Sequence, residues 1–358
     1  MHRQGFSMNR LVSVLVALGG VVLGGFVLIG PLVSAPSAAQ TEAAATADGA
    51  SDGGVPARTP WGEPDLQGIW SSGPILTPLE RPDEFEGREF VTDDERAELE
   101  AAAFTRLDHS AGGTREIDIR AGGAVGSYNS AFSGAGFQVV STGRTSQIVD
   151  PPDGKIPWKR GVRERLAAEV VVGSSERGFY LFEGDENPED RRNDRCRGVT
   201  LPLRFASAGA SGTVHRIVQT PGHVTIYYEH GHQGGAYRQI PMDRRSHLPA
   251  DFRQWLGDAR GAWDGETLVI DTTNFTRDTN YEGARDTLHL VERYTSVGPG
   301  QLMYRVAVED PTVFTRPWTI EIPMTRLDDG DNQIYESACH EGNYALTNIL
   351  AAARFQER

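Results

Sequence analysis

The stretch from Arg260 to Glu341 decides the fold of this chain. It reads RGAWDGETLVIDTT (260–273), LHLVERYT (288–295), LMYRVAVEDP (302–311), WTIEIPM (318–324) and QIYESACHE (333–341). Each segment is rich in β-branched and aromatic residues, tends to alternate apolar with polar positions, and ends near an Asp-Gly or Gly-Pro-Gly turn. Such strands with short connections form an antiparallel meander, which usually curls so that its edges are protected.

The residues before this stretch continue the strand pattern. Val214–Gln219 and Val224–His230 flank Thr-Pro-Gly, which is a hairpin signal, and Tyr237–Met242 follows. Arg144–Gly154 predicts one earlier strand that ends in a Pro-Pro-Asp-Gly turn. We therefore expect a mainly β protein, with an antiparallel barrel or curled sheet formed by residues 211–358.

Residues 59–210 predict an irregular N-terminal arm with short helices and strands. Thr92-Asp93-Asp94-Glu95 is a capping box, from which a helix should run to about Arg106. Arg160–Val171 predicts a second short helix and Tyr344–Arg354 a third.

The N-terminus has a targeting pattern. Leu11–Val33 is almost purely apolar, with Arg3 and Arg10 before it and small residues after it. Residues 1–39 are therefore expected to be a cleaved signal peptide or an uncleaved membrane anchor, and both place the folded part in the periplasm or otherwise outside the cytoplasm. Residues 40–58 have no apolar periodicity and predict a disordered linker.

Net charge and cysteine content narrow the possibilities further. The chain has 358 residues and a formal net charge of −14, with no basic stripe, so a nucleic-acid partner is not expected. Cys196 and Cys339 are the two cysteines. In an oxidising compartment they favour a disulfide, although two separate buried thiols are the alternative.

Seven phrases of this chain resemble a large family of exported bacterial proteins, and they span essentially the whole mature sequence. This resemblance implies no particular activity. A looser likeness to lipocalin-like barrels rests on Gly68-x-Trp70 and WDGETL (263–268), and it implies a fold with a central cavity. The seven phrases are PDLQGIW (64–70), IVDPPDG (148–154), RIVQTPGHV (216–224), SHLP (246–249), WLGDARG (255–261), VEDPTVFTRPW (308–318) and ACHEGNY (338–344).

Strand alternation places ionisable side chains on four faces that are otherwise apolar. A buried carboxylate must be paired or functional, and carboxylates beside imidazoles in a partly apolar cavity suit general acid–base catalysis. The alternative is that each is a strand-end residue bonded to a loop at the barrel rim. The predicted catalytic residues are His230, Glu292, Asp310, Glu336 and His340.

Aromatic and metal-binding possibilities complete the predicted site. An aromatic surface would suit a ring-bearing ligand, although core packing is the alternative. No cofactor is expected; a divalent metal on His230 and His232, with His223, Glu229, His247 or His340 completing the shell, is the alternative. The predicted ligand-binding residues are Tyr228, Tyr294, Tyr304, Arg316 and Trp318.

These observations favour an exported enzyme that performs an elimination, hydration or isomerisation on a small ring-containing molecule. No Gly-x-Ser-x-Gly elbow, P-loop or His-Glu-x-x-His motif is present, so a Ser-His-Asp hydrolase lacks local support. A non-catalytic binding protein for an apolar small molecule and a structural envelope protein with a filled barrel are the alternatives.

Overall fold

The structure is a computed structural model. It describes residues 57–73, 75–111, 138–166, 201–202, 214–229 and 236–330, with a few positions beyond. All of them belong to the second of the two units into which the chain divides, Gly49–Arg358. The predicted signal segment, Cys196, Cys339, His230, His232, Glu336 and His340 lie outside the described residues.

The named elements of the described fold are ten strands, one α-helix and one 3-10 helix. Within the described residues, no helix is long and apolar enough to span a membrane. The elements are β1 Gly68–Ser71, η1 Asp83–Phe85, α1 Asp93–Ala111, β2 Ile148–Asp150, β3 Val214–Thr220, β4 His223–Glu229, β5 Ala236–Pro241, β6 Asp258–Asp264, β7 Thr267–Thr273, β8 His289–Gly298, β9 Gln301–Glu309 and β10 Trp318–Leu327.

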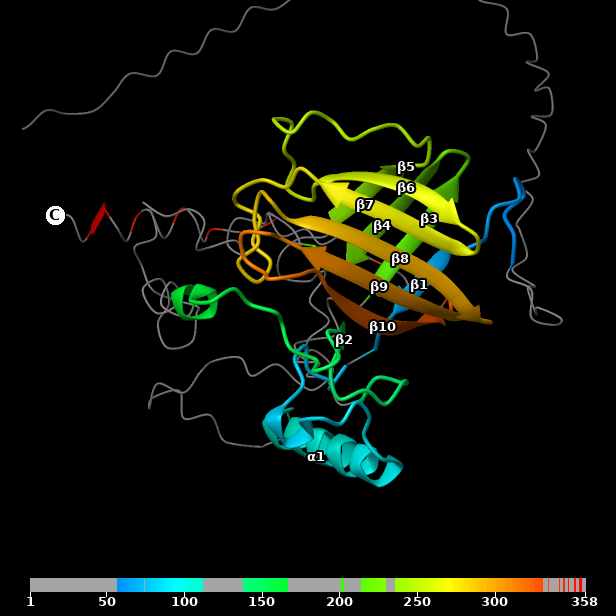
Figure 1. Ribbon diagram of the computed structural model, residues 1–358. Coiled ribbons are helices and arrows are strands. Elements are labelled where there is room, and N and C mark those ends of the chain that lie inside the picture. Colours follow the sequence, from blue (N-terminus) through cyan, green and yellow to red (C-terminus); the bar gives the residue numbers. More distant parts are fainter. Residues whose placement is uncertain are drawn as a thin grey trace, which may run out of the picture. The chain divides into compact units, whose positions relative to one another are not determined.

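The strands form one antiparallel sheet that curls into a barrel (Figure 1). Its order is β5-β4-β3-β1-β10-β9-β8-β7-β6, and β2 pairs with β10 outside this path. The two ends of the order, β5 and β6, lie beside each other. The prediction of a mainly β, lipocalin-like antiparallel barrel is therefore confirmed.

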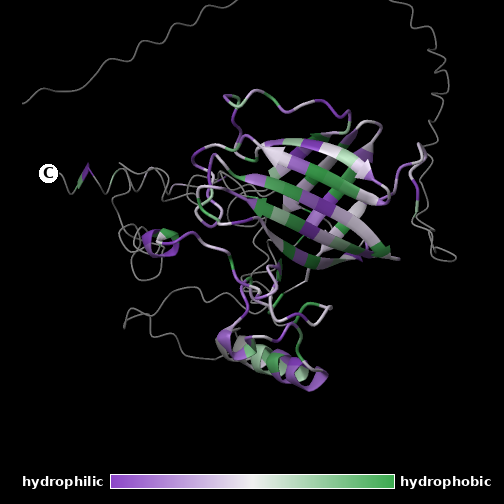
Figure 2. Ribbon diagram, in the orientation of Figure 1, coloured by the Kyte–Doolittle hydropathy of each residue, from purple (hydrophilic) through white to green (hydrophobic). Residues whose placement is uncertain are grey.

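Alternation along each strand separates the inside of the barrel from the outside (Figure 2). In β9, for example, Leu302, Tyr304, Val306 and Val308 are fully buried while the intervening residues are partly or fully exposed. Inward residues of the other strands join them in one continuous core. The same register places the predicted hairpin, β3 with β4, in the barrel wall.

The segment predicted as an arm contributes directly to the barrel. β1, which begins at Gly68, lies between β3 and β10, and Trp70 points inward opposite His215. The Trp70 indole donates a hydrogen bond to the carbonyl of Leu66, which satisfies its only polar atom in a buried position. The Gly68-x-Trp70 signal thus marks a structural strand.

The predicted capping box starts α1 as expected. Glu95 N donates to Thr92 Oγ1, and Thr92 N donates to Glu95 Oε2 at 2.8 Å. This reciprocal pair satisfies two backbone donors at the helix start. α1 extends to Ala111, past the predicted end near Arg106, and only residues 162–166 of the second predicted helix are described as helical.

Candidate functional site

The interior of the barrel contains a buried ion pair. Arg238 on β5 donates from Nη1 to Glu292 Oε2 on β8 at 2.7 Å, and both side chains are almost fully buried. β5 and β8 are not neighbours in the sheet, so the two side chains meet across the barrel interior. A buried pair of this kind is costly to desolvate and persists only where further hydrogen bonds complete it.

Further buried groups complete the pair. Arg238 Nη1 also donates to the Tyr228 hydroxyl at 2.9 Å, and Nη2 donates to Thr272 Oγ1 at 2.8 Å. The Tyr304 hydroxyl donates to the second Glu292 oxygen at 3.1 Å. We call the set the inner polar cluster; its members are His215, Tyr228, Arg238, Thr272, Glu292, Tyr294 and Tyr304.

The electrostatics of the inner polar cluster follow from burial. Burial raises the pKa of Tyr228 to about 12, and it also raises the pKa values of Tyr294 and Tyr304 well above the usual value. Burial and, second, the Arg238 guanidinium together lower the pKa of His215 to about 3, so this imidazole is neutral. For Arg238 itself, burial acts to lower the pKa, but the Glu292 carboxylate helps to hold it above the usual value. The cluster therefore holds one cation and one carboxylate among neutral hydroxyls.

Among the described residues, the Nε donor of Arg238 lacks an acceptor. Arg238 Nε is buried and makes no hydrogen bond to any described residue. An unpaired buried donor of this kind costs about 1–3 kcal/mol. A bound water or an acceptor on a ligand would remove that cost.

Three of the five predicted ligand-binding residues, Tyr228, Tyr294 and Tyr304, lie together in the inner polar cluster. The rings of Tyr294 and Tyr304 are 4.8 Å apart. Trp318 instead packs in the core, stacked on Tyr281 and edge-on to Phe314. Arg316 is half-exposed and forms an ion pair with Asp150.

The two described members of the predicted catalytic set do not converge. Glu292 lies opposite Val306 on β9, and Asp310 comes four residues after Val306. At about 3.4 Å per residue the two positions are roughly 14 Å apart along the strand. Asp310 accepts hydrogen bonds from Thr287 Oγ1 and from Thr312 N and Oγ1, so it caps the loop after β9, as the rim alternative expected.

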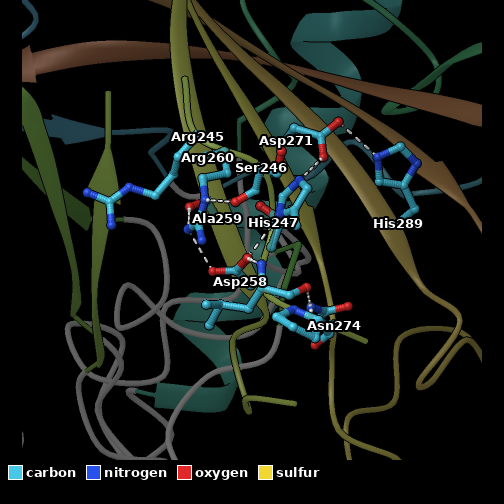
Figure 3. A network of polar contacts seen from close by, with 12 residues as sticks. Arg245, Ser246, His247, Asp258, Ala259, Arg260, Asp271, Asn274 and His289 are labelled. Atoms are coloured by element: carbon cyan, nitrogen blue, oxygen red, sulfur yellow. Dashed lines mark hydrogen bonds and ion pairs between the residues drawn. The ribbon is translucent and has the colours of Figure 1, made fainter. Parts of the chain in front are cut away.

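A second polar system lies on the outer face, where Figure 3 shows His247 between Asp258 and Asp271, and His289 beside Asp271. His247 Nδ1 is 3.1 Å from Asp258 Oδ2, and its Nε2 is 2.6 Å from Asp271 Oδ1. His289 Nε2 is 3.0 Å from the other Asp271 oxygen, and its Nδ1 is 3.2 Å from Glu309. We call this the outer histidine network: His247, Asp258, Arg260, Asp271, His289 and Glu309.

The outer histidine network links four adjacent strands to the connection between β5 and β6. Asp258 and Arg260 come from β6, Asp271 from β7, His289 from β8 and Glu309 from β9. The predicted use of His247 in a metal shell is not tested, because His230 and His232 lie outside the described residues. Within the described residues, no three side chains of His, Cys, Asp or Glu are arranged to hold a metal ion.

Sequence reasoning missed Arg238 and the outer histidine network. The alternation of apolar and polar residues in β5 could have indicated that Arg238 points inward, because Arg238 shares a face with Ala236 and Ile240. A carboxylate predicted inside an apolar barrel also requires a cation, which directs attention to inward-facing arginines.

Comparison with known proteins adds little to the assignment of the fold. No protein-family model and no curated protein matches the chain. Among solved structures, the fluorescent protein UnaG matches with 14% identity and a TM-score of 0.21, over 32% of this chain and 72% of its own. The secretory abundant heat soluble protein 4 of Ramazzottius varieornatus matches with 12% identity and a TM-score of 0.22, over 32% and 69%. The assignment to an antiparallel barrel therefore rests on strand order and register, and the resemblance to an exported bacterial family stays a prediction.

Proposed function

We propose that this protein binds a small, ring-bearing molecule inside its barrel and holds an acceptor atom of that molecule on Arg238. The observation that carries the proposal is the buried Nε of Arg238, which has no acceptor among the described residues. The other two guanidinium nitrogens are fixed by Glu292, Tyr228 and Thr272, so the remaining edge has a set direction. The predicted export of the chain is part of the same proposal.

The surroundings of Arg238 favour an organic ligand over a free ion. Neutral tyrosine hydroxyls and apolar side chains surround the guanidinium, and Glu292 already neutralises its charge. Aromatic walls favour a flat apolar ligand body, and a polar group at one end fixes its orientation. A carboxylate or carbonyl oxygen is the acceptor that guanidinium nitrogens bind best.

Acid–base catalysis by Glu292 is the less favoured function. Its two oxygens accept from Arg238 and Tyr304, so neither is left without a donor for use as a general base. The catalytic roles predicted for Glu292, Asp310, His230, Glu336 and His340 stay predictions. Turnover that vanishes in Glu292→Gln while thermal stability is retained would restore them.

The binding proposal is tested by titrating the full chain with 2-naphthoate and with uncharged 2-methylnaphthalene, followed by calorimetry. We expect 2-naphthoate to bind about tenfold or more tightly than the hydrocarbon, because one charge-assisted hydrogen bond contributes roughly 1.5–3 kcal/mol. In the double variant Arg238→Met/Glu292→Met this preference should disappear.

A matched control replaces an ion pair on the outside of the barrel. Arg293 and Asp264 form an exposed pair at 2.6 Å, so Arg293→Met/Asp264→Leu makes a similar change away from the interior. This control should retain the preference for 2-naphthoate. Equal affinity of the two probes for the unmodified protein, or an unchanged preference in the inner double variant, would refute the proposal.

A further inference from the structure

The barrel closes at one seam without a backbone ladder. β5 and β6 stand at opposite ends of the strand order, and no described residues of the two strands pair through backbone hydrogen bonds. Each strand in this order is antiparallel to its neighbour. β5 and β6 are eight positions apart in the order, an even number, so they run in the same direction. Close packing replaces the ladder: a Cβ on Gly261 of β6 would lie 2.2 Å from Met242 Sδ and 2.8 Å from Ile240 Cγ2.

Residues 242–257 connect the two strands. Because β5 and β6 are parallel, this connection must run from the end of the barrel where β5 stops to the opposite end, where β6 starts. It is attached to the outer face at its middle. Leu248 N donates to Asp258 Oδ2 at 2.8 Å, and Arg260 Nε donates to the Ser246 carbonyl at 3.2 Å. Asn274 Nδ2 donates to the Leu248 carbonyl at 2.8 Å. His247 therefore sits at the centre of the attachment.

The contacts of the outer histidine network depend on how many protons its two rings carry. Both ring nitrogens of His247 face carboxylate oxygens, and so do both ring nitrogens of His289. A carboxylate only accepts, so each ring must carry two N–H groups to make both contacts. Arg260 and the two imidazolium rings then balance the three carboxylates of Asp258, Asp271 and Glu309.

We infer that the outer histidine network is a proton-dependent clamp that holds residues 242–257 against β6 and β7 and so keeps the β5–β6 seam closed. This inference stands apart from the proposed ligand, because it concerns the wall of the barrel. When the rings lose a proton, a lone pair replaces an N–H in each ring, and one contact per ring becomes repulsive. The raised pKa of His289, caused first by Asp271, agrees in direction with a network that favours the protonated state.

Of the two histidines, His247 is the one that attaches residues 242–257 to the barrel wall. His289 joins β8 to β7 and β9, which are already joined by backbone ladders. His247 alone among the two rings comes from the connection, and it meets Asp258 and Asp271 from two different strands. Asp258 from β6 and Asp271 from β7 contact its ring directly. Arg260 from β6 pairs with Asp258, His289 from β8 contacts Asp271, and Glu309 from β9 contacts His289.

The test is hydrogen exchange of the full chain at pH 6 and pH 9, corrected for the intrinsic exchange rate, with a chelator present. Amides of residues 243–257 should lose protection by about tenfold or more at pH 9, because a singly protonated ring cannot donate to both of its carboxylate neighbours. In His247→Gln these amides should exchange fast at both pH values. Amides of β3 and β4 report whether the barrel remains folded.

His223→Gln is the matched control, because His223 is exposed at the start of β4 and lies outside the network. It should keep the pH dependence of the unmodified protein. Protection of residues 243–257 that does not change with pH would overturn the inference, as would an unaltered pH dependence in His247→Gln. A failure of 2-naphthoate to bind would leave this result unaffected, so the two proposals fail separately.

Discussion

Arg238 on β5 and Glu292 on β8 meet inside the barrel at 2.7 Å, although the β5–β6 seam lies between their strands. Their ion pair thus spans, from the inside, the β5–β6 seam, where the described residues of the two strands form no backbone ladder. Thr272 on β7 binds the same guanidinium and strengthens this link. The pair therefore both closes the barrel and orients the donor that we assign to a ligand.

Removing one member of this pair should be far more damaging than removing both. Arg238→Met leaves the Glu292 carboxylate buried without its cation, and we expect a loss of about 3–5 kcal/mol in the free energy of unfolding. Arg238→Met/Glu292→Met replaces both charges with apolar side chains and should fall much closer to the unmodified protein. Urea unfolding followed by circular dichroism measures both variants. Equal losses in the single and double variants would contradict this account.

Gly261 should be needed because it lets β5 approach β6. A Cβ there meets Met242 Sδ and the branched Ile240 side chain. We expect Gly261→Ala to lower the free energy of unfolding by about 1–3 kcal/mol, as overpacked sites do. Shortening Met242 in Gly261→Ala/Met242→Ala should recover part of the loss, which the urea midpoint would report.

The control for this change is Gly298→Ala, because, apart from its chain neighbours, no described residue has an atom within 4 Å of the Cβ that would be added there. Its urea midpoint should stay within the error of the unmodified protein. If Gly261→Ala were equally harmless, the seam would have to be looser than the packing of Ile240 and Met242 indicates.

The barrel could be predicted from the sequence because strand alternation and turn residues are local signals. Residues 260–327 carry both, and β6 to β10 follow them closely. The Thr92–Glu95 capping box was readable for the same reason, since its two hydrogen bonds join residues three apart. Alternation also put Glu292 on the inward face of β8.

The side-chain contacts of the site residues could not be predicted from the sequence, because they depend on how strands distant in the sequence are arranged. Arg238 and Glu292 are 54 residues apart and come from strands that are not neighbours. His247 meets Asp271 only because the connection folds back over β6 and β7. The SHLP phrase therefore gave no hint of a network, and Asp310 was placed with Glu292 although it caps its own loop.

The outer histidine network should give the protein a stability that falls at alkaline pH. The pKa of His289 is raised above its usual value, first by its hydrogen bond to Asp271, so the folded state holds this proton more tightly. Its contribution is fully present below the unfolded pKa near 6.5 and is lost as pH rises through the folded value. Partly exposed pairs of this type contribute only about 0.2–1 kcal/mol each.

Asp271 should make the stability fall at acid pH, because its pKa in the folded state is lowered, first by the hydrogen bond from His289. That contribution is present above the unfolded pKa near 4 and is lost as pH falls through the folded value. Urea midpoints measured from pH 3 to pH 9 should therefore fall towards both ends. His289→Gln should reduce the loss of stability on the alkaline side, whereas His223→Gln should not; an alkaline loss that is unchanged in His289→Gln would count against the assignment.

Asp310 should prove structural. It is almost fully buried, and it accepts from the Thr312 amide and from the hydroxyls of Thr312 and Thr287. Asp310→Ala leaves these donors unsatisfied and should lower the free energy of unfolding by about 1–3 kcal/mol. Asp310→Asn keeps one acceptor oxygen and should lose less, and Asp264→Ala on the exposed surface should be nearly neutral. An Asp310→Ala variant with full stability that alters only the binding of a small molecule would move this carboxylate back into the functional site.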